Sequence, residues 1–315
     1  MAVVPLQLGE SVPELVHGSI IAIGNFDGVH LGHAALIAAA RKKAGSKQVV
    51  AVTFDPHPLV LLAPERYQPP LTTVNDRARH LGEIGVDHVV VLQTTRELLA
   101  LAPEAFFERI VRGSLRASGM AEGFNFRFGL DRAGSNEMLK SLCEAAGMRF
   151  REVSAFEKDG RPVSSSLVRN ALNEGNVVAA TALLNRHYHL TGRVVTGAKR
   201  GRTIGFPTAN LEGIETLVPA EGVYAVIANT PTERFAGAAN IGPNPTFGEN
   251  ARKIEVHLLD FTGDLYGTAM TVAFVERLRG TTKFSGLDAL KEQLQKDILM
   301  VRSMRVILGV EPETS

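Results

Sequence analysis

The sequence contains no tryptophan, one cysteine and few aromatic residues, which make up 6% of its 315 residues. The single cysteine, Cys143, excludes an intramolecular disulfide and a cysteine-based zinc cluster, and it fits a reducing compartment. Because Cys143 falls in a helix-like run, we expect a buried structural thiol. No stretch approaches about 18 uninterrupted apolar residues, and the start lacks a basic segment followed by an apolar one. We therefore expect a cytoplasmic protein that neither spans a membrane nor has a membrane as its partner.

Net charge is almost absent, since 34 Lys and Arg residues balance 33 Asp and Glu residues. This balance gives no indication of a nucleic acid partner, so any phosphate binding has to be local. The phosphate-binding patterns GxxxxGK[ST] and GxGxxG are both missing, which excludes a P-loop and a dinucleotide fingerprint. With 45% hydrophobic and 21% charged residues, the chain has the composition of a folded protein, and its length suits two domains.

The two halves of the sequence differ in rhythm. In the first half, short apolar runs such as SIIAIGNF, KQVVAVTF and DHVVVLQ alternate with helix-like stretches. This alternation predicts an α/β fold with a mostly parallel, doubly wound sheet, which binds ligands beyond the carboxyl ends of its strands. Residues 188–278 read instead as strands separated by Gly and Pro turns, which predicts an antiparallel β-barrel or sandwich.

Two helix-like stretches precede the second half, and a closing amphipathic helix follows it. The closing helix is indicated by Leu287, Leu290, Leu294 and Ile298, which repeat at spacings of three and four. We place the boundary near Asn185 to His187, giving domains 1–185 and 186–315.

One short segment of the first half, GNFDGVHLGH, concentrates chemical groups. It follows the buried run IAI and precedes an Ala-rich helical run, so His30 and His33 lie at a strand-to-helix turn with Gly28 and Gly32 beside them. Free backbone N–H groups and the positive end of a helix dipole meet at such a turn, which favours an anion. Two plainer interpretations stay open, because the histidines could be satisfied structural side chains or two ligands of a metal site. The metal interpretation lacks an evident third ligand.

This segment resembles the signature of the HxGH nucleotidylyltransferases, which join a nucleoside monophosphate to an acceptor and release pyrophosphate. Six further motifs follow in the order found in the bacterial bifunctional riboflavin kinase and FMN adenylyltransferase (FAD synthetase) family. They are TFDPHP (53–58), GFNFRFG (123–129), VSSSLVR (163–169), YHLTGRVVTGAKRGRTIGFPTAN (188–210), NIGPNPTFG (240–248) and EVHLLDFTGDLYG (255–267). The resemblance covers nearly the whole chain and implies a nucleotidylyltransferase domain followed by a riboflavin kinase barrel.

The resemblance also implies roles for individual residues. His30, His33 and Arg169 stabilise the adenylyl transfer, and Glu255 is the general base that takes the proton from the 5′-hydroxyl of riboflavin. Thr208 is expected to bind Mg²⁺. The residues expected to contact ATP are Gly24, Asn25, Phe26, Asp27, Gly28, His30, His33, Asn125, Ser164, Ser165, Arg169, Gly197, Lys199, Gly201, Thr208 and Asn210. The residues expected to contact the flavin are Phe54, Pro56, His57, Phe126, Phe128, Arg279 and Phe284.

From the residues alone, purely structural interpretations of these motifs also remain open. FDPHP could be a rigid turn with one core aromatic, VSSSLVR could supply a helix N-cap, and the basic loop 197–205 could be solvated. Glu255 alternates with the apolar Ile254 and Val256, so it could be an ordinary surface carboxylate. The chain also departs from the family at Thr281 and Thr282, where an acidic residue is common, and we expect altered flavin contacts or loop closure there with catalysis retained.

The leading hypothesis is a bifunctional enzyme that makes FMN from riboflavin and ATP, and FAD from FMN and ATP, with Mg²⁺ in both steps. Its expected partners are these small molecules alone, with an oligomer left open. Two alternatives are an adenylyltransferase with an inactive flavin-binding barrel, and a flavin-binding protein without activity. The retention of both histidines, Thr208, Asn210 and Glu255 favours the bifunctional enzyme.

Overall fold

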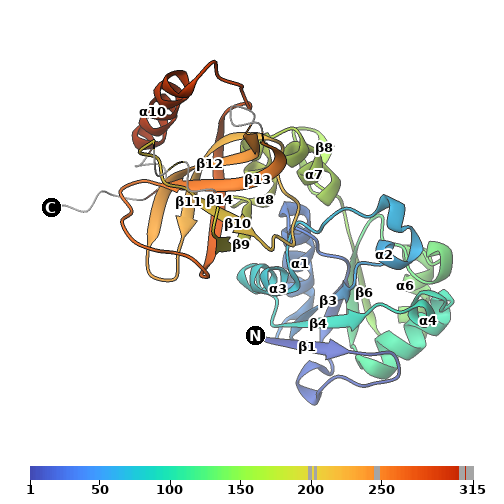
Figure 1. Ribbon diagram of the computed structural model, residues 1–315. Helices are drawn as coiled ribbons and strands as arrows, with labels where there is room; N and C mark the ends of the chain where they lie inside the picture. The colour runs from blue at the N-terminus through green and yellow to red at the C-terminus, as the bar shows by residue number, and fades with distance from the viewer. Residues whose placement is uncertain (198–200, 202–203, 245–248, 305–308, 310–315) are drawn as a thin grey trace. The chain divides into compact units, whose positions relative to one another are not determined.

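The computed structural model describes residues 1–197, 201, 204–244, 249–304 and 309. Contacts within the chain divide it into two compact units, Met1–Ser165 and Ser166–Ser315 (Figure 1). Among the described residues, no helix has both the length and the apolar character needed to cross a membrane.

A six-stranded parallel sheet forms the centre of the first unit, in the order β1-β4-β3-β2-β5-β6. Its strands are β1 (Ala2–Leu6), β2 (Ile20–Ile23), β3 (Val49–Asp55), β4 (His88–Gln93), β5 (Gly119–Gly123) and β6 (Arg149–Val153). This confirms the parallel α/β architecture predicted from the alternation. Strand β1 is not predicted from the sequence; it joins the sheet at an edge, where the missing N–H of Pro5 is tolerated.

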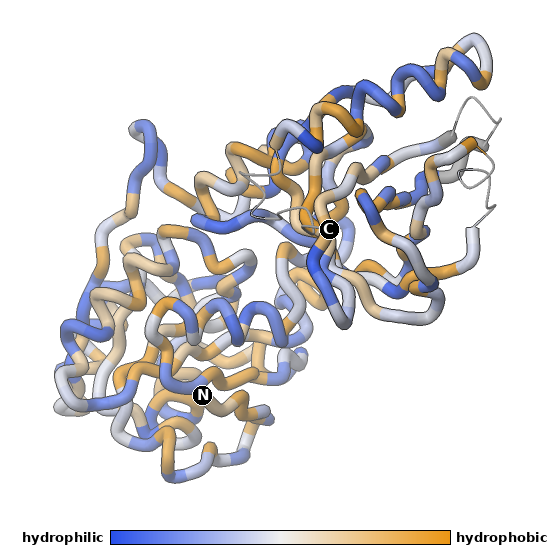
Figure 2. Tube along the Cα trace, turned by 90° about the vertical axis from the view of Figure 1, so that its left-hand side faces the viewer, coloured by the Kyte–Doolittle hydropathy of each residue, from blue (hydrophilic) through white to orange (hydrophobic). Residues whose placement is uncertain are grey.

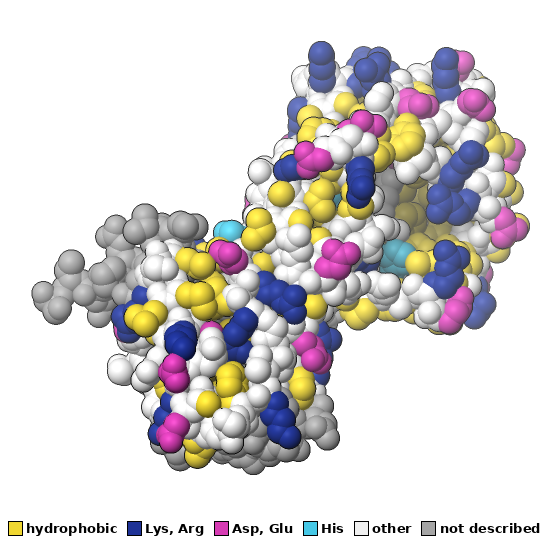
Figure 3. Space-filling view, turned by 90° about the horizontal axis from the view of Figure 1, so that it is seen from above, with side chains coloured by type: hydrophobic (Ala, Val, Ile, Leu, Met, Phe, Trp, Pro, Cys, Tyr) yellow, Lys and Arg dark blue, Asp and Glu magenta, His cyan; other side chains and the backbone are white. Residues whose placement is uncertain are grey.

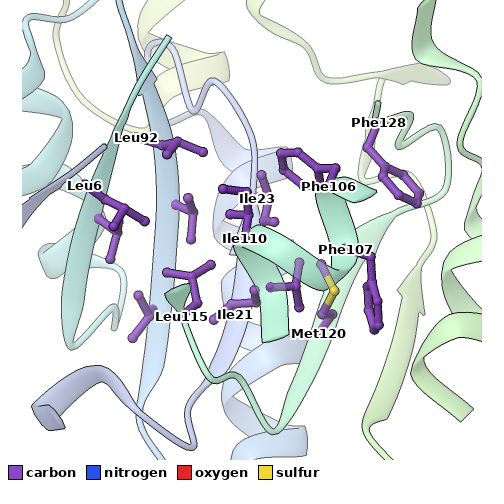
Figure 4. Packing of buried hydrophobic residues seen from close by; sticks show 14 of the residues in the cluster. Leu6, Ile21, Ile23, Leu92, Phe106, Phe107, Ile110, Leu115, Met120 and Phe128 are labelled. Atoms are coloured by element: carbon purple, nitrogen blue, oxygen red, sulfur yellow. The ribbon is translucent and has the colours of Figure 1, made fainter. Parts of the chain in front are cut away.

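Helices cover both faces of this sheet. On one face, α1 (Leu31–Ala44) and α3 (Val74–Glu83) pack against strand residues such as Ile20 and Ala22. On the other face, α5 (Pro103–Phe106), the helical segment η3 (Phe107–Ser114) and α6 (Asn136–Ala145) pack against Ile21, Ile23 and Leu92 (Figure 4). Because side chains alternate along a strand, neighbouring residues of β2 serve opposite layers, and the doubly wound arrangement follows.

Shorter elements complete the first unit. They are η1 (Glu14–Val16), α2 (Leu59–Leu62), η2 (Pro64–Arg66), α4 (Arg96–Leu99), η4 (Leu130–Arg132), β7 (Glu157–Lys158) and β8 (Arg161–Pro162). Cys143 on α6 is a buried free thiol, as predicted, and burial, together with the nearby carboxyls of Glu122 and Glu144, raises its pKa to about 12.

The second unit contains a closed antiparallel barrel in the order β10-β13-β12-β11-β14-β9. Its strands are β9 (His189–Val195), β10 (Ala209–Glu212), β11 (Gly222–Asn229), β12 (Arg234–Asn244), β13 (Glu249–Leu258) and β14 (Ala269–Arg279). Closure decides between the barrel and the sandwich that the sequence left open. Large buried side chains such as Tyr224 and Phe274, whose rings meet edge to face at 5.2 Å between centroids, belong to its core.

Among the described residues, three helices accompany the barrel. The closing helix α10 (Leu287–Ser303) carries both polar and apolar positions (Figure 2). Its apolar residues Ile298 and Val301 belong to a cluster with Ala225 and Ile227 of β11. Helices α7 (Ser165–Asn173) and α8 (Val177–Leu184) also count with the second unit, apart from Ser165. The domain boundary at 185/186 stays a prediction from the sequence.

Candidate functional site

The turn between β2 and α1 has an unusual backbone. Phe26 and Val29 adopt positive φ angles of 47° and 41°, although neither is a glycine, and both side chains are buried. Each such residue costs about 1–3 kcal/mol and persists only when its surroundings hold it in place. Gly28 between them, with φ 81°, takes the same conformation without a steric penalty. The turn is therefore held in a fixed shape by the side chains packed beneath it.

His30 and His33 cap α1 reciprocally. The backbone N–H of His33 donates to Nδ1 of His30 at 3.4 Å, and the N–H of His30 donates to Nδ1 of His33 at 3.3 Å. Because both Nδ1 atoms accept, the proton of each neutral ring lies on Nε2. The rings stack with centroids 3.7 Å apart. Two Nε2–H donors thus accompany the positive end of the helix dipole, which suits an anion.

Gly32 allows this arrangement. A Cβ atom at this position would lie 3.0 Å from the carbonyl oxygen of Val163 and 3.1 Å from Nδ1 of His30. The segment before α7 therefore runs directly over the start of α1, and Ser165 Oγ donates to the carbonyl oxygen of Asp27 at 2.9 Å. Among the described residues of this unit, no third histidine or carboxylate joins the pair to form a group that could hold a metal ion.

A buried network lies behind the turn. The carboxylate of Asp27 accepts from the N–H groups of Leu71 and Thr72 at 2.8 and 3.3 Å, and Arg77 lies 4.0 Å from it. Arg77 also donates to the hydroxyl of Thr53 at 2.8 Å. Burial lowers the pKa of Arg77, while Asp27 and Asp55 act in the opposite direction. Asp27 and Arg77 thus hold the turn from beneath, and sequence reasoning missed Arg77.

Asn25 and His57 connect two of the motifs. The amide nitrogen of Asn25 lies 2.9 Å from Nε2 of His57, and the N–H of Leu59 donates to Nδ1 of His57 at 3.1 Å. Phe54 is half-buried against the core of this unit, and Pro56 is exposed. Figure 3 shows a hollow in this unit with histidine and hydrophobic side chains on its walls, as a site for a flat ligand requires.

The aromatic loop after β5 divides its three rings differently from the sequence prediction. Phe128 is 6% exposed and packs between Phe126 and Phe106, with ring centroids 5.7 and 6.0 Å away. Phe124, which the sequence analysis did not select, is 49% exposed, and Asn125 beside it is exposed as well. Phe128 therefore supports the loop from the core, whereas Phe124 and the half-buried Phe126 are more accessible to a ligand.

Glu122 is the second residue that sequence reasoning missed. It lies fully buried on β5, where its Oε1 accepts from the N–H of Ile23 at 2.9 Å. The ladder between β2 and β5 has its last pair at Ile21 and Met120, so this carboxyl satisfies a backbone donor that the sheet leaves open. Its Oε2 has no hydrogen-bond partner within the described part of the chain. Burial raises the pKa of Glu122 well above its usual range.

The barrel aligns three polar residues on adjacent strands. Glu255 on β13 is paired directly with Asn210 on β10 and with Asn240 on β12. Side chains of directly opposite residues share a face of the sheet and lie close together. The neighbours Ile254 and Val256 are buried, as the predicted alternation requires. Glu255 and Asn210 are thereby brought together, while Thr208 precedes β10 immediately and has an exposed side chain.

Two glycines near Asn210 allow other parts of the chain to pack closely against them. A Cβ at Gly197 would collide with the side chain of Asn210, and one at Gly201 would collide with the carbonyl oxygen of Phe206. The N–H of Phe206 donates to the carbonyl of Gly201 at 2.8 Å, so these two residues lie close together. Lys199 lies outside the described residues.

The remaining predicted residues of the second unit are Arg169 on α7, Arg279 at the end of β14, and Phe284 in the segment between β14 and α10. Arg169 is a half-buried residue of α7. Arg279 donates to both carboxylate oxygens of Asp297 on α10, at 2.8–3.1 Å, and its guanidinium lies 5.6 Å from the centroid of Phe284. The Arg279 guanidinium thus links β14 of the barrel to α10 through the Asp297 carboxylate. Thr281 Oγ1 is buried with no partner among the described residues.

Comparisons with known proteins agree on both units. A model of the FAD synthetase family matches residues 12–167, and a model of the riboflavin kinase family matches residues 184–305. The bifunctional riboflavin kinase/FMN adenylyltransferase of Escherichia coli (strain K12) is 37% identical, with 90% of this chain and 92% of that protein covered. The protein of the same name from Pseudomonas fluorescens is 38% identical, with 91% and 93% covered.

A crystal structure described as a macrolide-efflux protein from Streptococcus pneumoniae is also similar, with a TM-score of 0.86 and 31% identity over 96% of this chain and 99% of that one. Its description names transport, whereas the family models that match the two halves of this chain both describe enzymes. The relatives cover both units in a single alignment, and the two family models match them in the same order. By these matches the chain belongs to the bifunctional riboflavin kinase/FMN adenylyltransferase family.

Proposed function

We propose that this chain makes FAD in two steps, phosphorylating riboflavin with ATP to give FMN and ADP, and then joining FMN to the AMP moiety of a second ATP with release of pyrophosphate. Family membership supports both steps. The observation that carries the second step is the reciprocal cap of His30 and His33, which assigns an Nε2–H donor to each ring at the start of α1. The observation that carries the first is the pairing of Glu255 with Asn210.

In the adenylyl transfer, a phosphate oxygen of FMN attacks the α-phosphorus of ATP in line, and the bond from that phosphorus to the pyrophosphate oxygen breaks. No protein nucleophile is needed, so catalysis consists of positioning and charge stabilisation. The Nε2–H groups of His30 and His33 donate to phosphate oxygens as negative charge develops. We assign Arg169 and the hydroxyls of Ser164 and Ser165 to the same triphosphate.

The backbone of residues 24–28 binds the nucleotide in this proposal. The side chains of Phe26 and Asp27 are buried and hold the turn, so these two residues act through their backbone. Asn25 and Asn125 orient the reacting phosphates. Phe54, Pro56, His57 and Phe126 line the flavin side of the site, with Phe128 supporting the loop from below.

In the kinase step, the 5′-hydroxyl of riboflavin attacks the γ-phosphorus of ATP, and the bond to the ADP oxygen breaks. Glu255 accepts the hydroxyl proton as the oxygen–phosphorus bond forms. Asn210 lies beside it on the neighbouring strand, and we assign its side chain and the backbone groups of Gly197 and Gly201 to the nucleotide phosphates. Arg279 and Phe284 form the wall for the flavin ring, with the Arg279 head group held by Asp297.

Mg²⁺ suits the donor set of this barrel site. The hydroxyl of Thr208 and the amide oxygen of Asn210 are hard oxygen ligands, which Mg²⁺ prefers. Thr208 is exposed and lies two residues before Asn210 in the sequence. Its hydroxyl is therefore accessible to a metal–nucleotide complex. When bound there, the ion neutralises charge on the β- and γ-phosphates.

The two activities are assigned to residues 1–185 for adenylyl transfer and 186–315 for the kinase. Riboflavin, FMN and ATP are its partners, without a nucleic acid, and we place the enzyme in the cytoplasm, where a single unpaired thiol is stable. An oligomer is compatible with this assignment and is not required by it.

A timed product analysis tests the proposal. The purified chain is incubated with riboflavin, ATP and Mg²⁺, and the flavins are separated by chromatography. FMN appearing first and FAD afterwards is the expected result. FMN without FAD would refute the adenylyltransferase assignment. FAD from supplied FMN, but none from riboflavin, would refute the kinase assignment, and bound riboflavin without any product would indicate a binding protein.

Two matched variants separate the sites. We expect His33→Ala to lower FAD formation from supplied FMN by about 100-fold, through the loss of a donor to developing charge, and to leave FMN formation unchanged. Glu255→Gln should show the opposite pattern, because its amide has the shape of the carboxylate but accepts no proton. Equal loss of both activities in either variant would contradict two separate sites.

A further inference from the structure

His257 lies on the same strand as Glu255 and on the same face. The two residues are separated by the buried Val256, so both side chains point away from the interior layer, about 7 Å apart along the strand. The position is not among those that the sequence assigns to substrate or metal. Its ring nevertheless contacts the segment that carries Thr208.

The contact is a hydrogen bond of defined direction. Nδ1 of His257 lies 2.8 Å from the carbonyl oxygen of Pro207. A carbonyl oxygen only accepts, so Nδ1 carries the proton and donates. The ring also meets Phe206 at an angle of 67°, with centroids 5.9 Å apart. Two consecutive residues, Phe206 and Pro207, are thus in contact with one side chain of β13.

The sheet register explains what this bond does. The ladder between β10 and β13 consists of the pairs Ala209 with Val256 and Asn210 with Glu255. Continued by one residue, the same register sets Thr208 opposite His257, but β10 begins only at Ala209. Backbone pairing therefore stops at Ala209 and does not include Thr208. The side chain of His257 supplies the next link between the two segments through the carbonyl of Pro207.

We propose that His257 is a positioning residue for phosphoryl transfer, whose bond to Pro207 sets Thr208 and Asn210 at a fixed distance from Glu255. This inference rests on the proposed kinase function of the barrel. His257 itself touches neither reacting atom. Its contribution is the placement of a phosphate-binding segment beside the general base, and a misplacement of about 1 Å at such a site costs on the order of 100-fold in rate.

Three substitutions in the full-length chain distinguish this role from ordinary packing. In His257→Asn, the amide nitrogen takes nearly the place of Nδ1, so the donor is retained. In His257→Gln, the amide extends towards the position of Nε2 and misses the carbonyl. His257→Ala removes donor and ring together. FAD formation from supplied FMN provides an internal control, since none of the residues assigned to it lies on a barrel strand.

We expect Gln and Ala at this position to lower the kcat of riboflavin phosphorylation by about 10- to 100-fold, with the KM for riboflavin changed less than about threefold. Asn should restore most of the kcat. If all three variants retain the wild-type kcat, or if Asn is as impaired as Ala, the proposal is wrong. A parallel loss of FAD formation would also overturn it, because general unfolding would then explain the effect.

Hydrogen exchange read by mass spectrometry gives an answer that does not depend on turnover. Amides of residues 209–212 should exchange faster in the Gln and Ala variants than in the wild type and in the Asn variant. Amides of β11, on another side of the barrel, should be unchanged. Equal protection of 209–212 in all variants would refute the positioning role. If the wild type forms no FMN, the kinase assignment fails, and the exchange data still decide whether His257 holds this segment.

Discussion

Glu122→Gln should remove a pH dependence of stability from the first unit. Glu122 is fully buried, and its protonated form is the one that the fold favours, because burial penalises the charge and raises its pKa. Glutamine keeps an oxygen that can accept from the N–H of Ile23, which lies 2.9 Å from Oε1. The exchange therefore preserves the shape and the hydrogen bond and removes only the ionisation.

The sign and the size of the effect follow from proton linkage. A carboxyl in the unfolded chain loses its proton near pH 4.3, whereas the folded pKa of Glu122 is raised. Between these two values the folded state binds more protons than the unfolded state. The free energy of unfolding then falls by about 1.4 kcal/mol for each pH unit gained, and the stabilisation is complete only below the unfolded pKa. The glutamine variant lacks this contribution.

The assay is denaturant-dependent hydrogen exchange at pH 5, 6 and 7, read from peptides of β2 and β5, with barrel peptides as the control. The difference in unfolding free energy between Glu122→Gln and wild type should grow in favour of the variant as the pH rises, by up to about 1.4 kcal/mol per pH unit. The barrel peptides should show no such trend. A difference that stays constant across this range would refute the reasoning, since it would mean that Glu122 ionises in the fold as it does in the unfolded chain.

Two further predictions concern single contacts. Gly32→Ala should lower FAD formation by about 10- to 100-fold and leave FMN formation intact. The reason is that the new Cβ would lie 3.1 Å from the His30 ring and displace it. A steady-state assay of both activities checks this prediction, and unchanged FAD formation would contradict it. Asp297→Ala should destabilise the barrel by about 3 kcal/mol, since Asp297 is 1% exposed and its loss leaves Arg279 without its carboxylate. Thermal unfolding of the variant against Asp260→Ala, whose partner Arg302 is exposed, provides the comparison, and equal effects of the two would show that the buried pair contributes no more than a surface pair.

Much of the architecture could be predicted because it depends on local patterns. The period of two in the strands and of three to four in α10 shows directly in the sequence, and so does the change from alternating elements to consecutive strands. The turn of His30 and His33 was predictable for the same reason, since glycines, histidines and a helix start lie within ten residues. The family motifs extended these expectations to Glu255, Thr208 and Asn210.

Other elements could not be predicted because their stability comes from distant partners. Strand β10 has only four residues and exists through its pairing with β9 and β13. Strand β1 likewise depends on β4, which lies more than 80 residues away in the chain. Phe124 is exposed and Phe128 is buried because the core accommodates only one of these two rings. A repeated aromatic pattern does not contain that information.

The sequence by itself determined the fold classes, the order of the two units and the location of the turn that carries His30 and His33, because each depends on residues that are close along the chain. The tertiary structure decided the states of the groups: the position of the ring protons of His30 and His33, through their mutual cap, and the raised pKa of Glu122, through burial. It also set Glu255 beside Asn210 and brought His257 to Pro207, some 50 residues away. Protonation, pairing and burial depend on atoms that only folding brings together.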